Sequence, residues 1–340
     1  MKLENFKEVF LVAELSANHN QDKKLALETI KAAKLSGANA IKLQTYTPDC
    51  MSLDCDREDF KIKGTLWEGK NFYALYKEAM TPWEWHEELF SYAKSLGLVC
   101  FSSPFSKKGV DFLESLGNPI YKVASFEIVD LELVAYMART KKPIILSKGI
   151  ATYEEICEAI KVCKENGASD ITLLQCTSAY PAPINEANLS LLPKMKKDFG
   201  VKVGLSDHTL GNLAAISAVA LGARVIEKHF ILDRKLGGVD SAFSMEPQEF
   251  LTMSKEIRNV ELLLGNGSYE LSQKSKEGRA FMRSLYVIAP IKKGERFSRD
   301  NIASIRPGFG LAPKYLSQIL GKVAKKDYEF GEALGNEEIE

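Results

Sequence analysis

The sequence predicts a (β/α)₈ TIM barrel followed by a small second domain. Short runs rich in β-branched and apolar residues alternate with longer amphipathic segments, and eight such runs occur, the number of strands that this barrel requires. The composition changes after about Leu264, where a stretch rich in Gly, Ser, Lys and Glu begins. A chain of 340 residues is long enough for one large domain and one small one.

The eight β-branched runs are the predicted strands. They are Val9–Glu14, Ala40–Thr45, Leu98–Phe105, Ile120–Ser125, Pro143–Gly149, Ile171–Ser178, Lys202–His208 and Ala223–Phe230. The helix-like segments between them include Lys23–Ser36, Pro82–Ser95, Tyr153–Asn166 and Leu213–Leu221. These four segments are followed by Gly37, Gly97, Gly167 and Gly222. A residue in the left-handed conformation is favoured just after a helix, so each glycine is predicted to end one.

Three parts of the chain follow from these patterns. Residues 1–264 are predicted to form the barrel, 265–280 a linker and 281–340 the second domain. Within the barrel, Cys50–Tyr73 is a long insertion after the second strand, and insertions at that end of a barrel often shape the active site. The second domain is expected to be mostly irregular or β, with a strand-like piece at Leu285–Ala289. Its size of about 60 residues is near the lower limit for independent folding.

Composition excludes several classes of function. Lys and Arg total 45, as do Asp and Glu, so the net charge is zero and no overall basic field points to a nucleic acid or an anionic membrane. No stretch is long and apolar enough to span a bilayer, and the first apolar run ends at Glu14 without a signal-peptide pattern. The six cysteines form no CxxC pair and indicate reduced thiols. We therefore expect a cytoplasmic protein with no nucleic-acid or membrane partner.

Polar residues gather at the C-terminal ends of the predicted strands, where the chemistry of such barrels takes place. In chain order they are Glu14, Lys42, Gln44, Ser103, Lys122, Ser125, Glu127, Ser147, Ser178, Tyr180, Ser206, His208, Glu227 and His229. Any one of them could be polar only because strand ends are exposed to water. A polar or ionisable group at all eight ends favours an active site.

The two lysines at these ends indicate an anion. Lys42 and Lys122 alternate with apolar neighbours, so both are predicted to point into the barrel mouth. Burying an unpaired ammonium is costly, and a bound phosphate or carboxylate would offset that cost. The alternative is a pair of internal ion pairs with Glu14 or Glu127. Hydroxyl donors near the same position are Ser103, Ser125 and Ser147.

The histidines indicate a metal. His208 and His229 end adjacent predicted strands, so their imidazoles could bind one divalent ion and leave positions open for water and substrate. A structural pair or a general acid is the alternative interpretation of two histidines. The other two histidines are assigned differently: His86 lies in a helix-like segment and is predicted to pack, whereas His19 follows the first strand and is predicted to contact substrate.

Several of these segments resemble the sialic acid synthases over nearly the whole chain. The matching segments are Ala13-Glu14 with Asn18-His19-Asn20, Ile41-Lys42-Leu43-Gln44, Tyr121-Lys122-Val123-Ala124-Ser125, Gly204-Leu205-Ser206-Asp207-His208-Thr209 and Glu227-Lys228-His229-Phe230. The tail from Arg283, with Ile291-Lys292-Lys293-Gly294-Glu295 and Arg306-Pro307-Gly308, resembles the antifreeze-like (SAF, β-clip) domain that ends those enzymes.

Within that family, other segments resemble the pseudaminic acid synthases more than the N-acetylneuraminate synthases. They include Gly64-Thr65-Leu66-Trp67, Thr81-Pro82-Trp83-Glu84-Trp85-His86 and Ser125-Phe126-Glu127. Gln21 and Lys148 depart from the family pattern. N-acetylneuraminate or legionaminate synthesis remains the alternative within the class, and a non-catalytic sugar-binding protein is the alternative outside it.

The resemblance implies an activity and roles for the polar residues. Phosphoenolpyruvate would condense with 2,4-diacetamido-2,4,6-trideoxy-β-L-altropyranose and water to give pseudaminic acid and phosphate. A divalent cation (Mn²⁺, Mg²⁺ or Co²⁺) would bind His208 and His229, Glu14 would be the base, and Glu227 would join the catalytic set. The implied phosphoenolpyruvate contacts are Lys42, Lys122, Ser103, Ser125, Ser147 and Ser206. The implied contacts of the amino sugar include Glu127, Tyr180 and Asp240, and Gln44 and Ser178 are further substrate contacts. The family also implies a homodimer with swapped domains, in which Arg306 reaches the other subunit's site.

Overall fold

The computed structural model describes residue 3, residues 6–64 and residues 66–338. The chain divides into two compact units, Met1–Gly265 and Asn266–Glu340, and each is described here by itself. Within these described stretches, no helix combines the length and the apolar character needed to cross a membrane.

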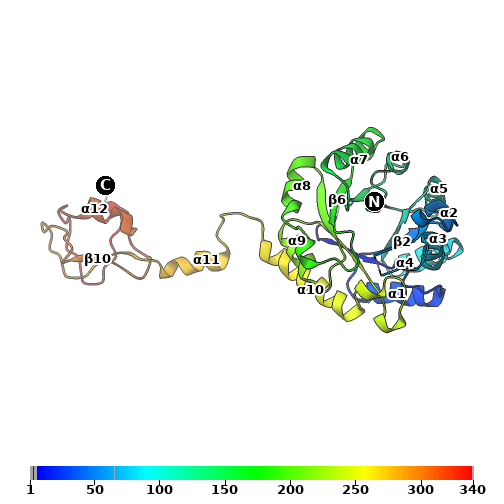
Figure 1. The fold of residues 1–340 in the computed structure, drawn as a ribbon. Coiled ribbons are helices and arrows are strands. Elements are labelled where there is room, and N and C mark those ends of the chain that lie inside the picture. The colour runs from blue at the N-terminus through cyan, green and yellow to red at the C-terminus, as the bar shows by residue number, and fades with distance from the viewer. Residues whose placement is uncertain (1–2, 4–5, 65, 339–340) are drawn as a thin grey trace. The chain divides into compact units, whose positions relative to one another are not determined.

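The first unit is a closed barrel of eight parallel strands in the order β1 to β8, with β1 paired to β8 (Figure 1). The strands are β1 (Phe10–Glu14), β2 (Ala40–Thr45), β3 (Val99–Pro104), β4 (Tyr121–Val123), β5 (Ile144–Ser147), β6 (Ile171–Cys176), β7 (Lys202–Asp207) and β8 (Val225–His229). The predicted barrel is confirmed, and each strand lies within its predicted run. The largest difference is at β4, because the chain leaves the sheet after Val123.

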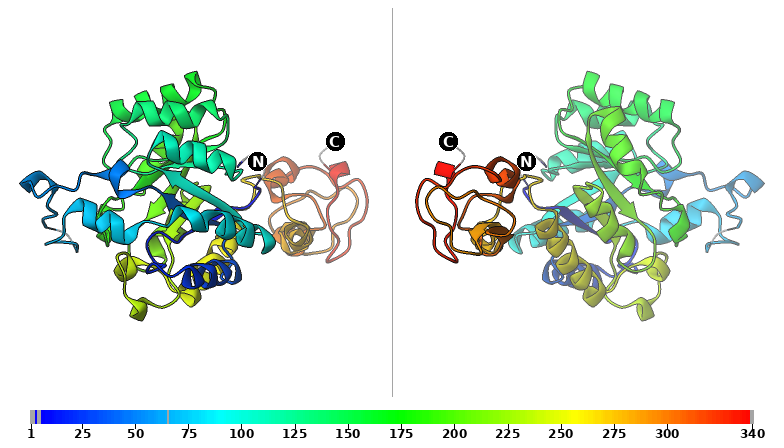
Figure 2. Two further views of the ribbon diagram at one scale, coloured as in Figure 1. Left: turned by 90° about the vertical axis from the view of Figure 1, so that its right-hand side faces the viewer. Right: turned by 90° about the vertical axis from the view of Figure 1, so that its left-hand side faces the viewer.

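Helices surround the barrel, as two further views show (Figure 2). The α-helices of this unit are α1 (Lys23–Leu35), α2 (Pro48–Met51), α3 (Phe72–Ala79), α4 (His86–Ser95), α5 (Lys107–Ser115), α6 (Leu131–Arg139), α7 (Tyr153–Glu165), α8 (Leu191–Phe199), α9 (Leu213–Ala220) and α10 (Pro247–Leu264). Short 3₁₀ helices are η2 (Glu58–Phe60), η3 (Trp83–Trp85), η4 (Ile184–Glu186), η5 (Arg234–Leu236) and η6 (Ser241–Phe243).

Local sequence explains where these helices begin and end. The Asp22 side chain accepts hydrogen bonds from the first turn of α1, and Thr152 with Glu155 forms a capping box at the start of α7. The glycines predicted to follow helices adopt positive φ: 87° at Gly37 and 100° at Gly167, with Gly97 and Gly222 similar at 66° and 96°. This conformation is easy only for glycine, so it stops the helix and turns the chain toward the next strand.

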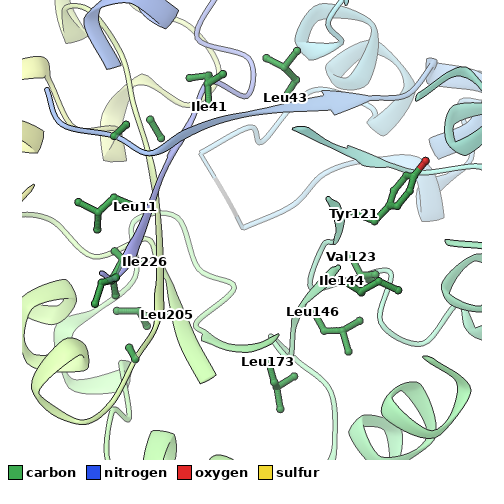
Figure 3. Packing of buried hydrophobic residues seen from close by; sticks show 14 of the residues in the cluster. Leu11, Ile41, Leu43, Tyr121, Val123, Ile144, Leu146, Leu173, Leu205 and Ile226 are labelled. Atoms are coloured by element: carbon green, nitrogen blue, oxygen red, sulfur yellow. The ribbon is translucent and has the colours of Figure 1, made fainter. Parts of the chain in front are cut away.

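Strand residues that point outward pack under the helices and form the main hydrophobic core. Figure 3 shows part of this layer, including Leu11 of β1, Ile41 of β2, Leu173 of β6 and Ile226 of β8. Burial of these side chains between strands and helices is the main stabilising term of the fold.

Residues that point inward divide into two layers because side chains alternate along a strand. Phe10, Val12, Phe101 and Ile145 belong to a buried apolar cluster that fills the N-terminal part of the barrel. The next inward positions are polar, for example Glu14 after Val12. The barrel interior is therefore packed with apolar side chains at its N-terminal end and lined with polar side chains at its C-terminal end.

The second unit has its own hydrophobic core around a small antiparallel sheet. Strands β9 (Ser284–Val287) and β10 (Ile302–Ile305) pair, with Tyr286 opposite Ala303. The core residues are Leu285, Val287, Ile291, Phe297, Ile302, Leu311, Ile319, Ala324, Tyr328 and Leu334. The remaining elements are η7 (Arg279–Phe281), η8 (Pro313–Tyr315), α12 (Leu316–Ile319) and η9 (Asn336–Glu338). The segment 265–280 contains a short helix, α11 (Gln273–Gly278), where an irregular linker was expected.

Candidate functional site

The C-terminal mouth of the barrel opens into a cavity of about 420 Å³. Most of the polar strand-end residues line it: Glu14, Lys42, Gln44, Lys122, Ser125, Glu127, Ser147, Ser178, Tyr180, Ser206, His208, Glu227 and His229, together with Asp240. Because all eight strands are parallel, their carboxyl ends meet at one rim, and residues far apart in sequence converge there. Two predicted contact residues of the same unit, Ser103 and His19, do not line this cavity.

Buried charges form the floor of the cavity. Lys42 Nζ lies 2.7 Å from Glu14 Oε2 and 3.6 Å from Glu227 Oε1. Lys122 Nζ lies 3.5 Å from the same Glu227 oxygen. Gln44 Nε2 donates to Glu14 Oε1 at 3.0 Å. Both lysines point into the mouth as predicted, and both have ion pairs, so the alternative interpretation holds in part. Lys42 pairs with Glu14 as that alternative proposed, but Lys122 pairs with Glu227 and not with Glu127.

Burial changes the proton affinity of these groups. Desolvation raises the pKa of Glu14 to about 7, although the ammonium of Lys42 opposes this shift. Burial also raises the pKa of Glu127 to about 7. The pKa of Lys122 is lowered, mainly by burial and against the attraction of Glu227. A carboxyl group with a pKa near neutrality can exchange a proton at physiological pH, which suits a general base.

Hydroxyl groups surround the two lysines. Ser178 Oγ donates to Ser125 Oγ at 2.9 Å, and Ser206 Oγ donates to Glu227 Oε1 at 3.3 Å. The hydroxyls of Ser147 and Ser103 are buried and have no hydrogen-bond partner in the described part of the chain. Ser103 lies near the end of β3 and is withdrawn from the cavity lining. An unsatisfied buried hydroxyl is unfavourable, so Ser147 is ready to donate to a ligand in the cavity.

A glycine allows the loop after β5 to approach these hydroxyls. Gly149 has a φ of 37°, and a Cβ there would lie 2.2 Å from Ser125 Cβ and 2.7 Å from Ser178 Oγ. Only glycine fits that approach. Lys148, which departs from the family pattern, is half-buried, and its backbone N–H donates to Leu174 O at 3.0 Å. The departure therefore leaves Ser147 at the cavity wall.

The two histidines at the ends of β7 and β8 lie side by side. Their ring centroids are 5.4 Å apart. His208 Nδ1 is 2.9 Å from Thr177 O, and since a carbonyl only accepts, Nδ1 carries a proton. Burial lowers the pKa of His208, but Cys176 and the Thr177 carbonyl outweigh burial and raise that pKa above its usual value, so a cation would compete with a proton for Nε2. Burial and the nearby positive charges hold the pKa of His229 well below its usual value, so this imidazole is neutral. Its Nδ1 has no hydrogen-bond partner among the described residues and lies 3.8 Å from Asp240 Oδ2.

These features fit a divalent cation held by His208 and His229. Neutral imidazoles are the ligand form of histidine, and a ring N–H fixed by a backbone carbonyl is typical of metal-binding histidines. Within the described ranges, no group of three or more potential protein ligands gathers. A cation on two imidazoles would therefore take its remaining ligands from water and substrate, as an open catalytic site requires.

An apolar wall closes the other side of the cavity. It comes mainly from the segment after β2, with Tyr46, Ile62, Trp67, Phe72 and Tyr76 among its residues. Trp67 Nε1 donates to Val239 O at 3.0 Å, which ties the insertion to the loop after β8. Ile62, Trp67 and Phe72 lie in the insertion that was predicted to shape the site, and Tyr46 and Tyr76 flank it, but none of the five was predicted as a site residue. Their signal was the density of aromatic residues within one long insertion.

The remaining predictions differ in outcome. His86 is buried and its Nε2 lies 2.8 Å from Thr45 Oγ1, so it packs as predicted. The prediction for His19 is wrong: its ring is buried, its edge meets the ring of Trp85, and it does not line the cavity. Arg306 belongs to the second unit, where it is exposed directly after β10. Cys176, which sequence reasoning did not include, lines the cavity 4.0 Å from His208 Nδ1.

Comparison with known proteins identifies the family of the barrel and the type of domain in the C-terminal tail. A model of the NeuB family matches residues 29–269, and a model of the SAF domain matches residues 282–340. The chain belongs to the NeuB family. This NeuB-family chain is 50% identical over 337 residues to the pseudaminic acid synthase of Campylobacter jejuni strain 81-176, with 98% of each chain covered. It is 52% identical over 331 residues to the pseudaminic acid synthase of Helicobacter pylori, with 97% of each chain covered.

A solved structure gives the same fold. The N-acetylneuraminic acid synthetase of Leptospira borgpetersenii, in complex with citrate, is 30% identical and has a TM-score of 0.74. The match covers 82% of this chain and 94% of that one. The resemblance to the sialic acid synthases is thereby confirmed, as is the barrel with a C-terminal SAF domain.

Proposed function

We propose that this chain is a pseudaminic acid synthase. It condenses phosphoenolpyruvate with the 6-deoxy sugar 2,4-diacetamido-2,4,6-trideoxy-β-L-altropyranose and water, and releases pseudaminic acid and phosphate. The observation that carries the proposal is the cavity floor, where a buried carboxyl with a pKa of about 7, two lysines and two adjacent imidazoles share one barrel mouth. The identity to pseudaminic acid synthases over nearly the whole chain supports this substrate pair.

Phosphoenolpyruvate binds at the lysine side of the floor. Its phosphate and carboxylate are anions, and Lys42 and Lys122 are the buried cations of the cavity lining. The hydroxyls of Ser125, Ser147, Ser178 and Ser206 line the same cavity and supply further donors, whereas Ser103 is buried outside that lining. Charge-assisted hydrogen bonds of this kind hold an anion more strongly than neutral ones.

Glu14 acts as the base in this scheme. C3 of phosphoenolpyruvate forms a bond to the aldehyde carbon of the open sugar as the carbonyl π electrons move to the aldehyde oxygen, which takes up a proton, and water adds to C2 while Glu14 accepts its proton. The C2–O bond to phosphate then breaks as the new C2 hydroxyl gives its proton to the departing phosphate and becomes a carbonyl, so the phosphate leaves with the bonding electrons. Gln44 orients Glu14 through the 3.0 Å hydrogen bond to Oε1, and Glu227 favours the charged form of both lysines.

His208 and His229 would hold the divalent cation, with Mn²⁺, Mg²⁺ or Co²⁺ as the candidates. When bound, such a cation polarises a carbonyl oxygen and favours attack on its carbon. Burial keeps the His229 imidazole neutral, and Thr177 O accepts from His208 Nδ1, which leaves Nε2 as the ligand atom of that ring. Excess chelator is expected to abolish turnover, and restoring one of these ions is expected to recover it. Full activity in chelator would refute the metal site.

The sugar lies between the imidazoles and the apolar wall. Glu127, Tyr180 and Asp240 provide polar contacts on the cavity side. Within the wall, Ile62 and Phe72 have no hydrogen-bonding group and the Trp67 N–H already donates to Val239 O, so the polar groups that the wall adds are the hydroxyls of Tyr46 and Tyr76. A 6-deoxy sugar with apolar acetamido methyl groups matches that wall better than a more hydroxylated hexosamine.

The active assembly is a homodimer with swapped SAF domains in this proposal. The last turn of α10 exposes large apolar side chains, such as Leu262 at 81% and Leu263 at 83%, and Phe281 at 75% lies before β9. Apolar surface of this extent indicates a partner surface. A swapped arrangement covers it and brings Arg306 to the other subunit's site. The protein would act in the cytoplasm, since all six thiols are free and persist best in a reducing compartment.

One assay tests the activity and its alternatives. Phosphate release from phosphoenolpyruvate is measured with the diacetamido trideoxy sugar, its legionaminate-type isomer and N-acetylmannosamine. Turnover is expected to be fastest with the first. Preference for either of the others would move the assignment to a legionaminate or N-acetylneuraminate synthase, and tight sugar binding without phosphate release would indicate a binding protein.

A further inference from the structure

A buried ion pair lies between β7 and β8 on the outer side of the barrel wall. Lys228 Nζ is 2.6 Å from Asp207 Oδ2, and the exposed fractions of the two side chains are 0% and 1%. The two residues are direct partners in the register of the strands. Neither lines the cavity, because each alternates with inward-pointing neighbours. The pair therefore lies outside the cavity, yet along each strand it is next to residues that line the cavity.

The same pair also fixes the turn after β7. Asp207 Oδ1 accepts hydrogen bonds from Thr209 N at 2.9 Å and from Thr209 Oγ1 at 2.8 Å. Lys228 Nζ donates to Thr209 O at 2.6 Å. His208 stands between Asp207 and Thr209, so its backbone is held on both sides. His229 directly follows Lys228, so the same ammonium ties the ends of both histidine-bearing strands together.

Stability alone does not account for this arrangement. Burying two charges costs several kcal/mol per ion before their attraction is counted, and apolar residues of similar volume often stabilise a core equally well. The surrounding layer between strands and helices is apolar, as with Leu205 and Ile226, the preceding outward residues of β7 and β8. A charged pair at this position brings directional hydrogen bonds that an apolar pair cannot provide.

We propose that Asp207 and Lys228 are positioning residues that set the spacing of His208 and His229 for a divalent cation. The inference rests on the metal site of the proposed function and adds to it a pair of residues outside the cavity. The pair acts through the backbone: Lys228 and Asp207 hold the Thr209 turn against β8, and the two imidazoles keep the separation that one ion can bridge.

The test is binding of Mn²⁺ alone, followed by the electron paramagnetic resonance signal of the free ion, together with thermal unfolding. Lys228→Met is expected to raise the Mn²⁺ Kd by about 10-fold or more, in the range for residues that support metal ligands. A double variant, Asp207→Leu with Lys228→Met, replaces the pair by apolar residues. It is expected to recover thermal stability without recovering Mn²⁺ affinity.

The matched control is a second ion pair on the same strand. Lys202 Nζ lies 2.8 Å from Asp170 Oδ1 at the N-terminal end of β7, far from the histidine along the strand. Lys202→Met is expected to change stability but leave the Mn²⁺ Kd unaltered. Wild-type Mn²⁺ affinity in the double variant, or an equal loss in Lys202→Met, would overturn the positioning role. If the wild-type chain itself binds no Mn²⁺, the proposed metal site fails and this inference fails with it.

Discussion

Replacing Lys122 with Met provides a direct test of the anion site. The choice depends on the difference between the two lysines. Lys42 lies 2.7 Å from Glu14, so removing it leaves a buried carboxylate without its closest partner. Such a loss typically destabilises by about 3–5 kcal/mol and would confuse folding with binding. The ion pair of Lys122 with Glu227 is 3.5 Å long, beyond normal hydrogen-bond length. When Lys122 is removed, Glu227 still has Lys42 as an ion-pair partner.

The expected size of the effect follows from the contact that is lost. Lys122 would give phosphoenolpyruvate one charge-assisted hydrogen bond, and losing such a bond costs about 1.5–3 kcal/mol. At 1.4 kcal/mol per tenfold change, the KM for phosphoenolpyruvate should rise by about 10- to 150-fold. The KM for the sugar should change little, because Lys122 lies at the phosphoenolpyruvate side of the floor.

Steady-state phosphate release with varied phosphoenolpyruvate measures this change, and calorimetric titration of phosphoenolpyruvate checks it at equilibrium. Lys148→Met is the matched control, since Lys148 is half-buried one residue after Ser147 but does not line the cavity. An unchanged phosphoenolpyruvate KM in Lys122→Met, with a correctly folded protein, would show that this lysine is structural.

The other predictions concern the base, the apolar wall and the second domain. Glu14 must be deprotonated to accept a proton, so kcat/KM should rise with pH through about 7. Glu14→Gln should lower turnover by about 10²- to 10⁴-fold and abolish this rise with pH. An unaltered rise in the variant would exclude Glu14 as the base. Trp67→Ala should lower kcat/KM about 10-fold or more for the 6-deoxy sugar and less for a 6-hydroxyl analogue. Tyr73→Ala, which lies outside the cavity lining, should leave kcat/KM unchanged for both sugars. Equal losses for both sugars in Trp67→Ala would contradict the role of the wall. Mixing an Arg306→Ala chain with excess Glu14→Ala chain should regenerate activity, because one site then combines an intact barrel with an intact tail. No recovery after verified subunit exchange would place Arg306 outside the partner's site.

The barrel was predictable because its signals are local. Each strand is a short β-branched run, and each glycine after a helix takes the left-handed conformation that its position suggested. The polar strand ends were also predictable as a group, since a closed parallel barrel brings every carboxyl end to one rim. This rule needs no knowledge of which side chains touch.

Pairings within the site were not predictable, because they depend on packing between distant strands. The ion pairs considered as the alternative for the two lysines were with Glu14 or Glu127, but the barrel places Lys122 against Glu227 from β8. His19 is a histidine, like the two residues of the cavity, and it lies on a loop after a strand end, so it was predicted to contact substrate. Its ring instead packs against the ring of Trp85. Trp67 lies in an insertion whose path across the mouth no sequence pattern determines.

The charge balance of the floor explains how a base and an anion site can share one surface. Burial raises the pKa of Glu14 and the ammonium of Lys42 lowers it, and the two effects leave the value at about 7. An anion bound to Lys42 would divert part of that positive field from Glu14, so the carboxylate would hold a proton more strongly. Glu14 would thus become a stronger base once phosphoenolpyruvate is in place. In the proposed scheme Lys122, whose ion pair is with Glu227, would bind the same anion with less effect on Glu14, so one lysine would adjust the base and the other would hold the substrate.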